Sequence, residues 1–542
     1  MNNQLELGAF RFRRTYANDL LKLADLLSKR TALNEKARAL RNVVQTMNQP
    51  FKVAVIGYIK RGKSSLINAL IGRDLAVTDT EESTATVNCI TYGTGCSCNE
   101  FMIHWKNSQP RRQPLHELGS WSGKGAELER RVEGVDFLQF FTDSPLVEQM
   151  NIIDTPGVAS SSDFHEQIVR QFLNSDNTDA LVYVLGTDVR KDDAEILKRF
   201  TKIGMQGYAA YNCIGVMHLW DEVYWNETAK SNHAEAWGKV SARAEELRSH
   251  LKQELLTVVP VSAPLGLLAA VMPLAFWQDL VHFLKSYDSI QQLRSDLQKR
   301  EHVWRQSYSA LYELWCCAQD VSVPLISFKI CLYYLCSQKP DDAIEARDLI
   351  TQFSGIPTLR DFIDSRFLKR RVVINLRRIR NQVQTIFKEV RIILEKETAF
   401  LREELLFFKR IIDTLSDATL KNQAEKRYQS VQGELDSLSA SSLMIDELRL
   451  ESEARVQQMD NAIFLLEEWS EKSRWLTKAE VNNLDNCAKV VLEEPTEKEP
   501  DIKQLLKYAG DLAFFPDSNT RVCSQKIRAL YSYLQSIQHK WL

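Results

Sequence analysis

Residues 53–70 read VAVIGYIKRGKSSLINAL and contain a glycine- and lysine-bearing loop between two apolar runs. From Gly57 to Ser64 it matches G-x-x-x-x-G-K-S, with Gly62 and Lys63 at the fixed positions, between an apolar strand-like run and a helix-like run. In such a loop the backbone amides wrap phosphate groups, the lysine reaches the β- and γ-phosphate oxygens, and the serine hydroxyl binds Mg²⁺. Because strand, spacing and helix occur together, we expect a nucleoside triphosphate site rather than a chance match in a surface turn.

A second motif, NIIDTPG at residues 151–157, places an acid at the end of another apolar strand. In phosphate-loop enzymes an acid here holds Mg²⁺ through water and the glycine amide senses the γ-phosphate, roles that we expect for Asp154 and Gly157. Between the two motifs, Thr84 is our candidate for the switch threonine that ligates Mg²⁺ in the triphosphate state. The alternatives are a plain turn for NIIDTPG and an ordinary strand edge for Thr84 and its neighbours.

Strand-like and helix-like patterns alternate around these motifs from residue 51 to about residue 290. Several strand-like segments, among them FKVAVIG and ALVYVLGT, are near-continuous apolar runs, as a sheet buried on both faces requires. Helical patterns between them predict a mainly parallel α/β sheet flanked by helices. Residues 290–365, and the chain beyond them, show helical spacing with almost no strand signal.

The composition limits the classes of function. With a net charge of −2, the 542-residue chain has no global charge that would drive it onto nucleic acid. The first residues hold no apolar signal region and the ten cysteines are scattered, which favours a cytoplasmic protein with free thiols. The apolar run at residues 258–277 holds three prolines and is expected to be core rather than a membrane-spanning helix.

Several stretches together resemble the dynamin-like GTPases, specifically their bacterial branch. The phosphate loop continues as the family's G-K-S-S-L-x-N-A-L, and ESTATVNCITYG is similar to the family's switch segment, with Glu82 and Ser83 in place of the usual proline and threonine. LITQFSGIPTLRDFI (349–363) resembles the segment that closes the GTPase domain. The resemblance is strong over about residues 50–365 and only architectural elsewhere. It implies GTP hydrolysis, dimerisation of GTPase domains across their nucleotides and, often, membrane remodelling.

The base-reading motif departs from the family pattern. Guanine is normally read by N/T-K-x-D, whose aspartate accepts hydrogen bonds from guanine N1 and N2, whereas this chain reads HLWD. Asp221 is retained, but His218 and Leu219 replace the usual polar residue and lysine. A carboxylate at Asp221 still disfavours adenine, so GTP is expected over ATP. The segment VSA puts Ser262 and Ala263 in the last base-contacting loop.

The phosphate loop departs from the family at Lys60, where dynamin-like proteins usually carry a serine that helps to hold a monovalent cation against the phosphates. The ammonium group of Lys60 would replace that cation, so that Lys60 or Arg61 acts as a built-in finger stabilising charge in the transition state. The alternative is that both side chains point to solvent or to a partner surface.

The predicted site residues fall into three sets. The nucleotide contacts are Gly57, Tyr58, Ile59, Lys60, Arg61, Gly62, Lys63, Ser64, Ser65, Asp154, Gly157, His218, Leu219, Asp221, Ser262 and Ala263. The catalytic residues are Lys60, Arg61, Lys63 and Thr84. The Mg²⁺ ligands are Ser64, Thr84 and Asp154.

The resemblance also implies a division into domains. We expect N-terminal neck helices (1–50), a GTPase domain (51–365) with a helical insertion at about 285–345, a helical neck and stalk (366–492), and a linker with a C-terminal helix returning to the neck (493–542).

Two stretches of the stalk stand out. The serine-rich segment DSLSASSLMIDEL (436–448) is expected to form the tip turn, where Leu443, Met444 and Ile445 would be a weak membrane wedge. The segment AFLREELLFFKRII (399–412) has enough apolar residues for a helix buried on more than one face, and we expect it to be core.

These features predict a cytoplasmic dynamin-like GTPase that binds GTP or GDP and Mg²⁺, hydrolyses GTP, dimerises through its GTPase domain and couples this to a helical stalk for membrane remodelling or vesicle-related work. The expected partners are a second copy or a related dynamin-like protein, with peripheral membrane contact and no nucleic acid. The alternative is a nucleotide-binding assembly protein with little or no hydrolysis that acts through a partner protein, which the altered HLWD favours.

Overall fold

A computed structural model divides the chain into two compact units, Pro50–Ile374 and Met1–Gln49 with Asn375–Leu542. The expected domain boundary at residue 365 lies shortly before the start of α18 (Arg371–Thr414), whereas the structure divides the chain after Ile374, just inside that helix. The structure describes residues 2–47, 49–58, 61–73, 75, 86–106, 108–121, 134–155, 178–188, 193–198, 212–218, 220–229, 232–252, 254–368, 371–464, 477–491, 501–513 and 518–538.

The unit Pro50–Ile374 is built on one nine-stranded sheet with the order β4-β3-β5-β2-β6-β1-β7-β8-β9. The strands are β1 (Phe51–Gly57), β2 (Asn88–Tyr92), β3 (Glu100–Trp105), β4 (Ser108–Pro114), β5 (Val135–Thr142), β6 (Met150–Asp154), β7 (Ala180–Leu185), β8 (Cys213–Met217) and β9 (Thr257–Pro260). The β1–β6, β1–β7, β2–β5, β7–β8 and β8–β9 pairs are parallel. The expected mainly parallel α/β fold is therefore confirmed.

The sequence patterns miss three strands at one end of the sheet. β3 pairs antiparallel with both β4 and β5. The residues of β4, SQPRRQP, are almost all exposed, and β3 and β5 alternate between buried and less buried positions. These strands therefore lack the continuous apolar signal of β7 and β8, whose residues are all buried.

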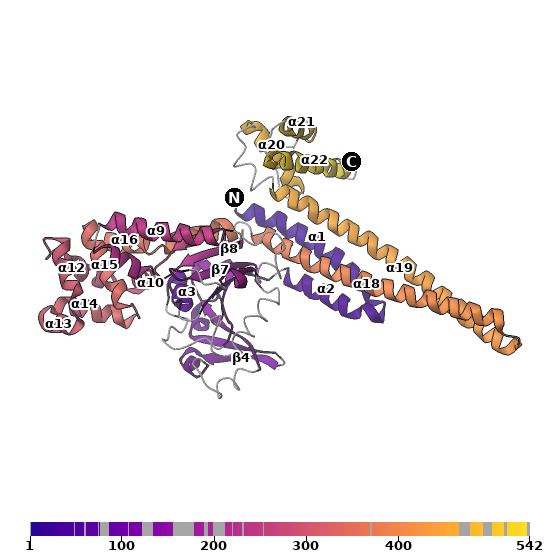
Figure 1. Ribbon diagram of the computed structural model, residues 1–542, viewed down its shortest axis with the longest axis horizontal. Helices are drawn as coiled ribbons and strands as arrows, with labels where there is room; N and C mark the ends of the chain where they lie inside the picture. Colours follow the sequence, from indigo (N-terminus) through magenta and orange to yellow (C-terminus); the bar gives the residue numbers. More distant parts are fainter. Residues whose placement is uncertain are drawn as a thin grey trace. The chain divides into compact units, whose positions relative to one another are not determined.

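Helices cover the sheet and form a cluster of their own. The described helices of this unit are α3 (Lys63–Ile71), α5 (Pro145–Glu148), α8 (Asp221–Glu227), α9 (His233–His250), α10 (Ala263–Val271), α11 (Leu274–Leu284), α12 (Ile290–Gln298), α13 (Glu301–Ser307), α14 (Ser309–Asp320), α15 (Leu325–Gln338), α16 (Ala343–Phe353) and α17 (Ile356–Phe362). Figure 1 shows α12, α13, α14 and α15 gathered together within this unit. They lie in the stretch expected to hold a helical insertion.

The apolar run 258–277 continues from β9 into α10 and α11. Among the described helices none is by itself long and apolar enough to cross a membrane, although α10 and α11 together have the length and composition across a bend of 113°. Most of their apolar side chains are buried in the core of the unit, including Leu268 and Trp277. The run is core, as the sequence predicted.

The other unit is helical throughout its described residues. Its helices are α1 (Asn2–Ser28), α2 (Asn34–Thr46), α18 (Arg371–Thr414), α19 (Ala418–Phe464), α20 (Lys478–Val491), α21 (Gln504–Ala513) and α22 (Ser518–Gln538). Figure 1 shows α1, α2, α18 and α19 running side by side, with α18 and α19 continuing beyond α2 as a two-helix hairpin. Lys36 of α2 pairs with Glu389 of α18 at 2.8 Å. The expected linker at 492–500 lies outside the described residues.

The predicted tip turn at 436–448 is wrong, because this segment lies inside α19. Its serines do not break the helix, since Ser439 and Ser441 donate their hydroxyls to the carbonyl oxygens four residues earlier. Four buried apolar residues of α19, Ala424, Val431, Leu438 and Ile445, also recur every seven residues through the segment. The turn between α18 and α19 instead comes before Asp417, whose carboxylate accepts from two backbone amides at the start of α19.

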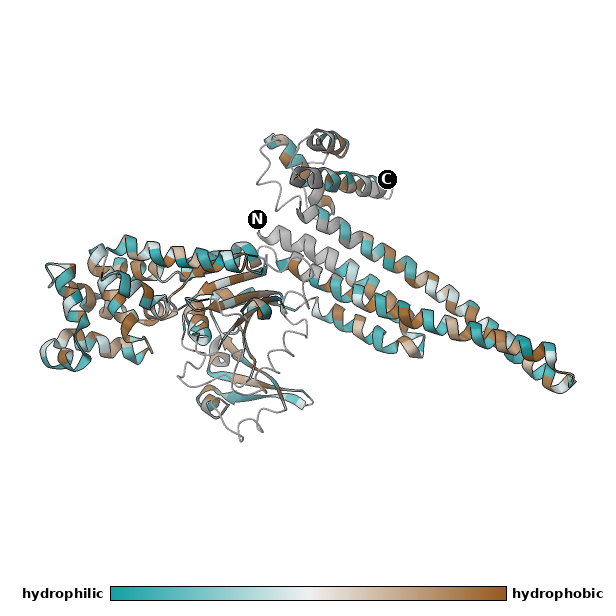
Figure 2. Ribbon diagram, viewed as in Figure 1, coloured by the Kyte–Doolittle hydropathy of each residue, from teal (hydrophilic) through white to brown (hydrophobic). Residues whose placement is uncertain are grey.

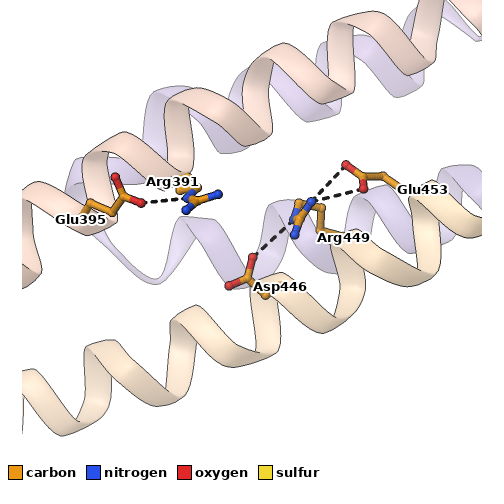
Figure 3. Close-up of polar contacts among 5 residues, drawn as sticks. All are labelled: Arg391, Glu395, Asp446, Arg449 and Glu453. Atoms are coloured by element: carbon orange, nitrogen blue, oxygen red, sulfur yellow. Dashed lines mark hydrogen bonds and ion pairs between the residues drawn. The ribbon is translucent and has the colours of Figure 1, made fainter.

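A groove of about 810 Å³ opens between α18 and α19, lined by apolar residues such as Leu394 and Ile445 and by charged residues. Figure 3 shows that the charged residues pair along their own helices, Arg391 with Glu395 on α18 and Arg449 with Asp446 and Glu453 on α19. Such exposed pairs within one helix contribute little to stability, about 0.3–0.5 kcal/mol each. They do not tie the two helices together; the ion pair between Arg427 and Glu404, at 2.9 Å, does.

Candidate nucleotide-binding site

The phosphate loop connects the end of β1, at Gly57, to the start of α3, at Lys63. Gly62 precedes α3 with a φ of 78°, in the left-handed region that side chains disfavour. A Cβ atom at Gly62 would also lie 2.6 Å from Cε1 of His218. Both the backbone and the packing therefore require glycine here, and the loop is held directly against the histidine of the HLWD segment.

Lys63, Ser64 and Asp154 lie together where the parallel strands β1 and β6 end. Ser64 Oγ donates to Asp154 Oδ2 at 3.3 Å, and Lys63 Nζ donates to the carbonyl oxygen of Tyr58 at 3.2 Å. Burial lowers the pKa of Lys63, with Asp154 opposing this effect and Arg61 adding to it. A buried ammonium group bonded to a carbonyl of its own loop is well placed to exchange that partner for a phosphate oxygen.

Asp154 carries the signature of a cation ligand. Its Oδ1 atom is buried and has no hydrogen-bond partner in the described part of the chain. Burial raises the pKa of Asp154 to about 6, against the lowering effects of Lys63, Ser64 and Asn88. Carboxylate and hydroxyl oxygens are the ligands that Mg²⁺ prefers, so Asp154 and Ser64 fit that ion.

A Mg²⁺ ion at this position would need further ligands. Within the described ranges no group of three or more His, Cys, Asp or Glu side chains could hold a metal by itself. Mg²⁺ is commonly bound by one or two protein ligands together with waters and nucleotide phosphates. The donor set of Ser64 and Asp154 therefore suits a metal that arrives with a nucleotide.

Arg61 lies inside the domain rather than on its surface. Its guanidinium group is 3.9 Å from the carboxylate of Asp193 and lies over the ring of Tyr58, 5.1 Å from the centroid. Asp193 in turn accepts from the hydroxyl of Tyr183 on β7 at 2.7 Å. This buried network links the phosphate loop to the segment after β7 and favours a structural role for Arg61. The sequence gave no sign of the contact between Arg61 and Asp193, because Asp193 is simply an acidic residue next to a helix-like run.

Asp221 begins α8 and is buried at the base-reading position. Its Oδ1 accepts from Ser262 Oγ at 3.0 Å and from Ser327 Oγ at 3.2 Å. Burial raises the pKa of Asp221, and the two serine hydroxyls act in the opposite direction. Ser262 belongs to the predicted VSA loop, but Ser327 comes from α15 and no motif in the sequence pointed to it.

His218 is also buried, with no hydrogen-bond partner at either ring nitrogen among the described residues. Burial lowers its pKa to about 4, so the ring is neutral at pH 7. Its imidazole packs against Gly62 of the phosphate loop. The packing of His218 against Gly62 therefore connects the base-reading segment to the phosphate loop.

The segment SGIP, which follows α16, seals the base-reading end. Gly355 has a φ of 76°, and a Cβ atom there would lie 2.2 Å from the carbonyl oxygen of Pro260. Its neighbour Ser354 accepts a backbone hydrogen bond from Ser262 at 2.8 Å. The segment that resembles the end of a dynamin-type GTPase domain is thus packed on the strand that carries the VSA loop.

The remaining predicted residues are of two kinds. Ser65 and Ala263 lie in the first turns of α3 and α10. Ile59, Lys60, Thr84, Gly157 and Leu219 lie outside the described residues, and their roles stay predictions.

Comparison with known proteins supports this assignment of the site. Residues 53–217 match the model of the dynamin family. The isoniazid-induced protein IniC of Mycobacterium tuberculosis is 28% identical over 232 residues, which cover 41% of this chain and 44% of IniC. A probable transmembrane GTPase, the FZO-like chloroplastic protein of Arabidopsis thaliana, is 21% identical over 177 residues, or 33% of this chain and 16% of that protein. The match thus spans less than half the length of either relative.

A solved structure of an oligomerised bacterial dynamin pair aligns with 97% of this chain and 79% of its own, at 12% identity and a TM-score of 0.30. A likeness at that score supports no conclusion about assembly. The family match covers β1 to β8 and both phosphate-site motifs, the part in which the sequence resemblance was strongest. Residues 53–217 of the chain therefore belong to a domain of the dynamin family.

Proposed function

We propose that the protein binds GTP together with Mg²⁺ and hydrolyses it. The observation that carries this proposal is the cluster of Ser64 with the buried residues Lys63 and Asp154, in which one carboxylate oxygen of Asp154 lacks a partner among the described residues. Lys63 would hold the β- and γ-phosphates, and Ser64 and Asp154 would hold Mg²⁺, which neutralises charge on the phosphate oxygens when bound. Asp221 would accept hydrogen bonds from the guanine base while Ser262 and Ser327 fix its orientation.

We further propose that GTP brings two GTPase domains together and that the helical unit transmits this event to a membrane or to a partner protein. Support comes from the family of the GTPase domain and from a relative described as a probable transmembrane GTPase.

The test is phosphate release from GTP at several protein concentrations, with and without Mg²⁺ and with and without liposomes. We expect turnover that requires Mg²⁺ and rises faster than linearly with protein concentration. Turnover that is absent under all conditions, while GTP still binds, would contradict hydrolysis.

One observation favours a second candidate function, a nucleotide-dependent assembly protein with little hydrolysis. Arg61, one of two candidates for a catalytic finger, is engaged with Asp193 inside the domain. The phosphate-release test separates the two functions, because the second requires tight GTP binding and GTP-dependent assembly without turnover.

A further inference from the structure

α18 is apolar on two opposite sides. Its inner face holds Val390 and Leu394, which are buried, and continues through the half-buried residues Leu401, Leu405 and Phe408. A second set of apolar residues, the outer stripe, consists of Ile392, Phe400, Leu406 and Phe407, with exposed fractions of 51%, 65%, 57% and 58%. At about 3.6 residues per turn the outer stripe lies on the side of the helix opposite the inner face. Figure 2 shows apolar residues along this hairpin.

The outer stripe explains why the sequence prediction for 399–412 was wrong. That segment is rich enough in apolar residues for a helix buried on more than one face, yet the structure buries only one. A helix of a monomeric protein normally turns charged residues toward solvent on its open side, and contiguous exposed apolar residues mark a contact surface. The unburied side is therefore a candidate docking surface.

The charges beside the outer stripe define what can cover it. Lys396 and Glu403 are exposed and make no ion pair within the described part of the chain. The sequence positions of Lys396 and Glu403 are symmetric about a point between Ala399 and Phe400. The positions of Ile392 and Phe407 are symmetric about the same point. A pattern that reverses charge and keeps apolar character about one point is complementary to itself when read in the opposite direction.

We infer that the outer stripe binds the outer stripe of a second copy of this chain, with the two α18 helices antiparallel. In this pairing Lys396 of each copy faces Glu403 of the other copy, so the ion pair forms twice. Ile392 packs against Phe407 of the other copy, and Phe400 lies beside the two-fold axis. The contact is separate from the nucleotide site and needs no nucleotide. Four half-exposed apolar side chains per copy form a small interface, so the pair is expected to be weak and to depend on protein concentration.

The first test uses sedimentation velocity on nucleotide-free protein over a range of concentrations. Phe400→Ser and Phe407→Ser are expected to weaken self-association at least about tenfold, because each removes an apolar contact from both copies. Leu443→Ser is the matched control, since Leu443 is equally apolar and exposed but lies on α19. An effect of Leu443→Ser as large as that of Phe400→Ser would overturn the assignment to α18.

The second test exchanges charges. Lys396→Glu and Glu403→Lys should each weaken association roughly tenfold, because like charges then face each other across the pair. The double variant should restore association, since the exchange recreates both pairs. Failure of the double variant to recover would show that these residues do not face each other.

The third test is geometric. Ala399→Cys lies next to the proposed two-fold axis and should form a disulfide between copies under mild oxidation, because Cα atoms there come within the roughly 7 Å that a disulfide allows. Ala440→Cys, on the exposed surface of α19, is the control and should not crosslink above the background of the exposed Cys317. Equal crosslinking at both positions would overturn the pairing.

Liposome cosedimentation of the same variants tests the alternative that the outer stripe binds a membrane. If Phe407→Ser abolishes liposome binding and leaves sedimentation unchanged, the outer stripe is a membrane surface and the pairing is wrong. Because association is measured without nucleotide and turnover with it, failure of this inference is distinguishable from failure of the proposed GTPase function.

Discussion

The phosphate end and the base-reading end of the site are assembled in different ways. At the phosphate end the loop itself supplies Lys63 and Ser64, and the paired strand β6 supplies Asp154. At the base-reading end Asp221 is held by Ser262 and by Ser327, which lies 106 positions away in the chain on α15. The first end depends on a short motif and a strand pairing, whereas the second depends on the packing of the whole helical insertion.

The sharpest test of the phosphate end is Lys63→Ala. It removes a buried cation that would face the phosphates and should lower GTP affinity by roughly 100-fold or more. Isothermal titration with GTP measures the effect. Lys198→Ala is the control, because Lys198 is an exposed lysine of the same unit. Near-normal GTP affinity for Lys63→Ala would refute the assignment of the loop.

Lys60→Ser tests the chemistry at the same end. If the ammonium group of Lys60 replaces a monovalent cation, the parent protein should hydrolyse GTP equally well in sodium, potassium or a bulky organic cation. The serine variant should then lose about 10²-fold in rate and depend on sodium or potassium. Initial phosphate release in the three salts is the measurement. A variant faster than the parent would indicate that Lys60 obstructs the site.

His218→Asn tests the junction between the two ends. The pKa of His218 is lowered by burial to about 4, whereas an unfolded histidine titrates near ~6.5. As pH falls from 7 to 5 the unfolded chain therefore binds a proton that the folded chain does not, and the native state loses about 2 kcal/mol of stability.

The asparagine variant should not show this loss, so its free energy of unfolding should fall less between pH 7 and pH 5. Urea unfolding at the two pH values measures the difference. His302→Asn, at an exposed position, is the control and should behave like the parent. The same pH dependence for His218→Asn and the parent would contradict a buried neutral histidine.

Asp221→Ala tests the base-reading end. We expect the parent to bind GTP about tenfold better than ATP, a difference of ~1.4 kcal/mol, and the variant to bind the two nucleotides more equally. The reason is that a carboxylate accepts from guanine N1 and N2, whereas adenine presents an acceptor at N1 beside its one amino donor. Competition titrations with both nucleotides give the ratio; equal affinities in the parent protein would favour a different nucleotide.

Ser327→Ala should have the smallest effect. Losing one of the two hydroxyl donors to Asp221 should weaken GTP binding by ~0.5–1.5 kcal/mol and leave ATP binding unchanged. Ser337→Ala, on the same helix, is the control because its hydroxyl donates to a carbonyl of its own helix. Equal effects of the two variants on GTP affinity would mean that α15 does not orient the base-reading residue.

The sequence was informative where a short motif determines the geometry. Gly62 and Lys63 follow from spacing alone, and the strand ending at Asp154 was visible as an apolar run. Ser327 was not predictable, because a serine in an apolar helix gives no sign of what it will face after packing. Arg61 was predicted as a finger, and its contact with Asp193 depends on the three-dimensional position of the segment after β7.

In the helical unit the errors have a common physical origin. The serines of 436–448 look like turn residues, yet bonding to carbonyls of their own helix and the buried Leu438 and Ile445 keep them helical. The actual turn had a modest signal, the capping residue Asp417. Sequence patterns reveal local preference, whereas the continuity of a long helix is decided by what it packs against.

The bond between Ser327 and Asp221 sets a lower limit on the size of a working GTPase domain. The family match ends at residue 217, but a shortened protein cut soon after β9 would lose α15, Ser354 and Gly355 together. It would retain the phosphate loop. The buried carboxylate of Asp221 would lose its hydrogen bond from Ser327, and Pro260 would lose its packing against Gly355. Such a fragment is expected to bind phosphates while discriminating poorly between bases, so expression of an isolated domain should extend at least through α17.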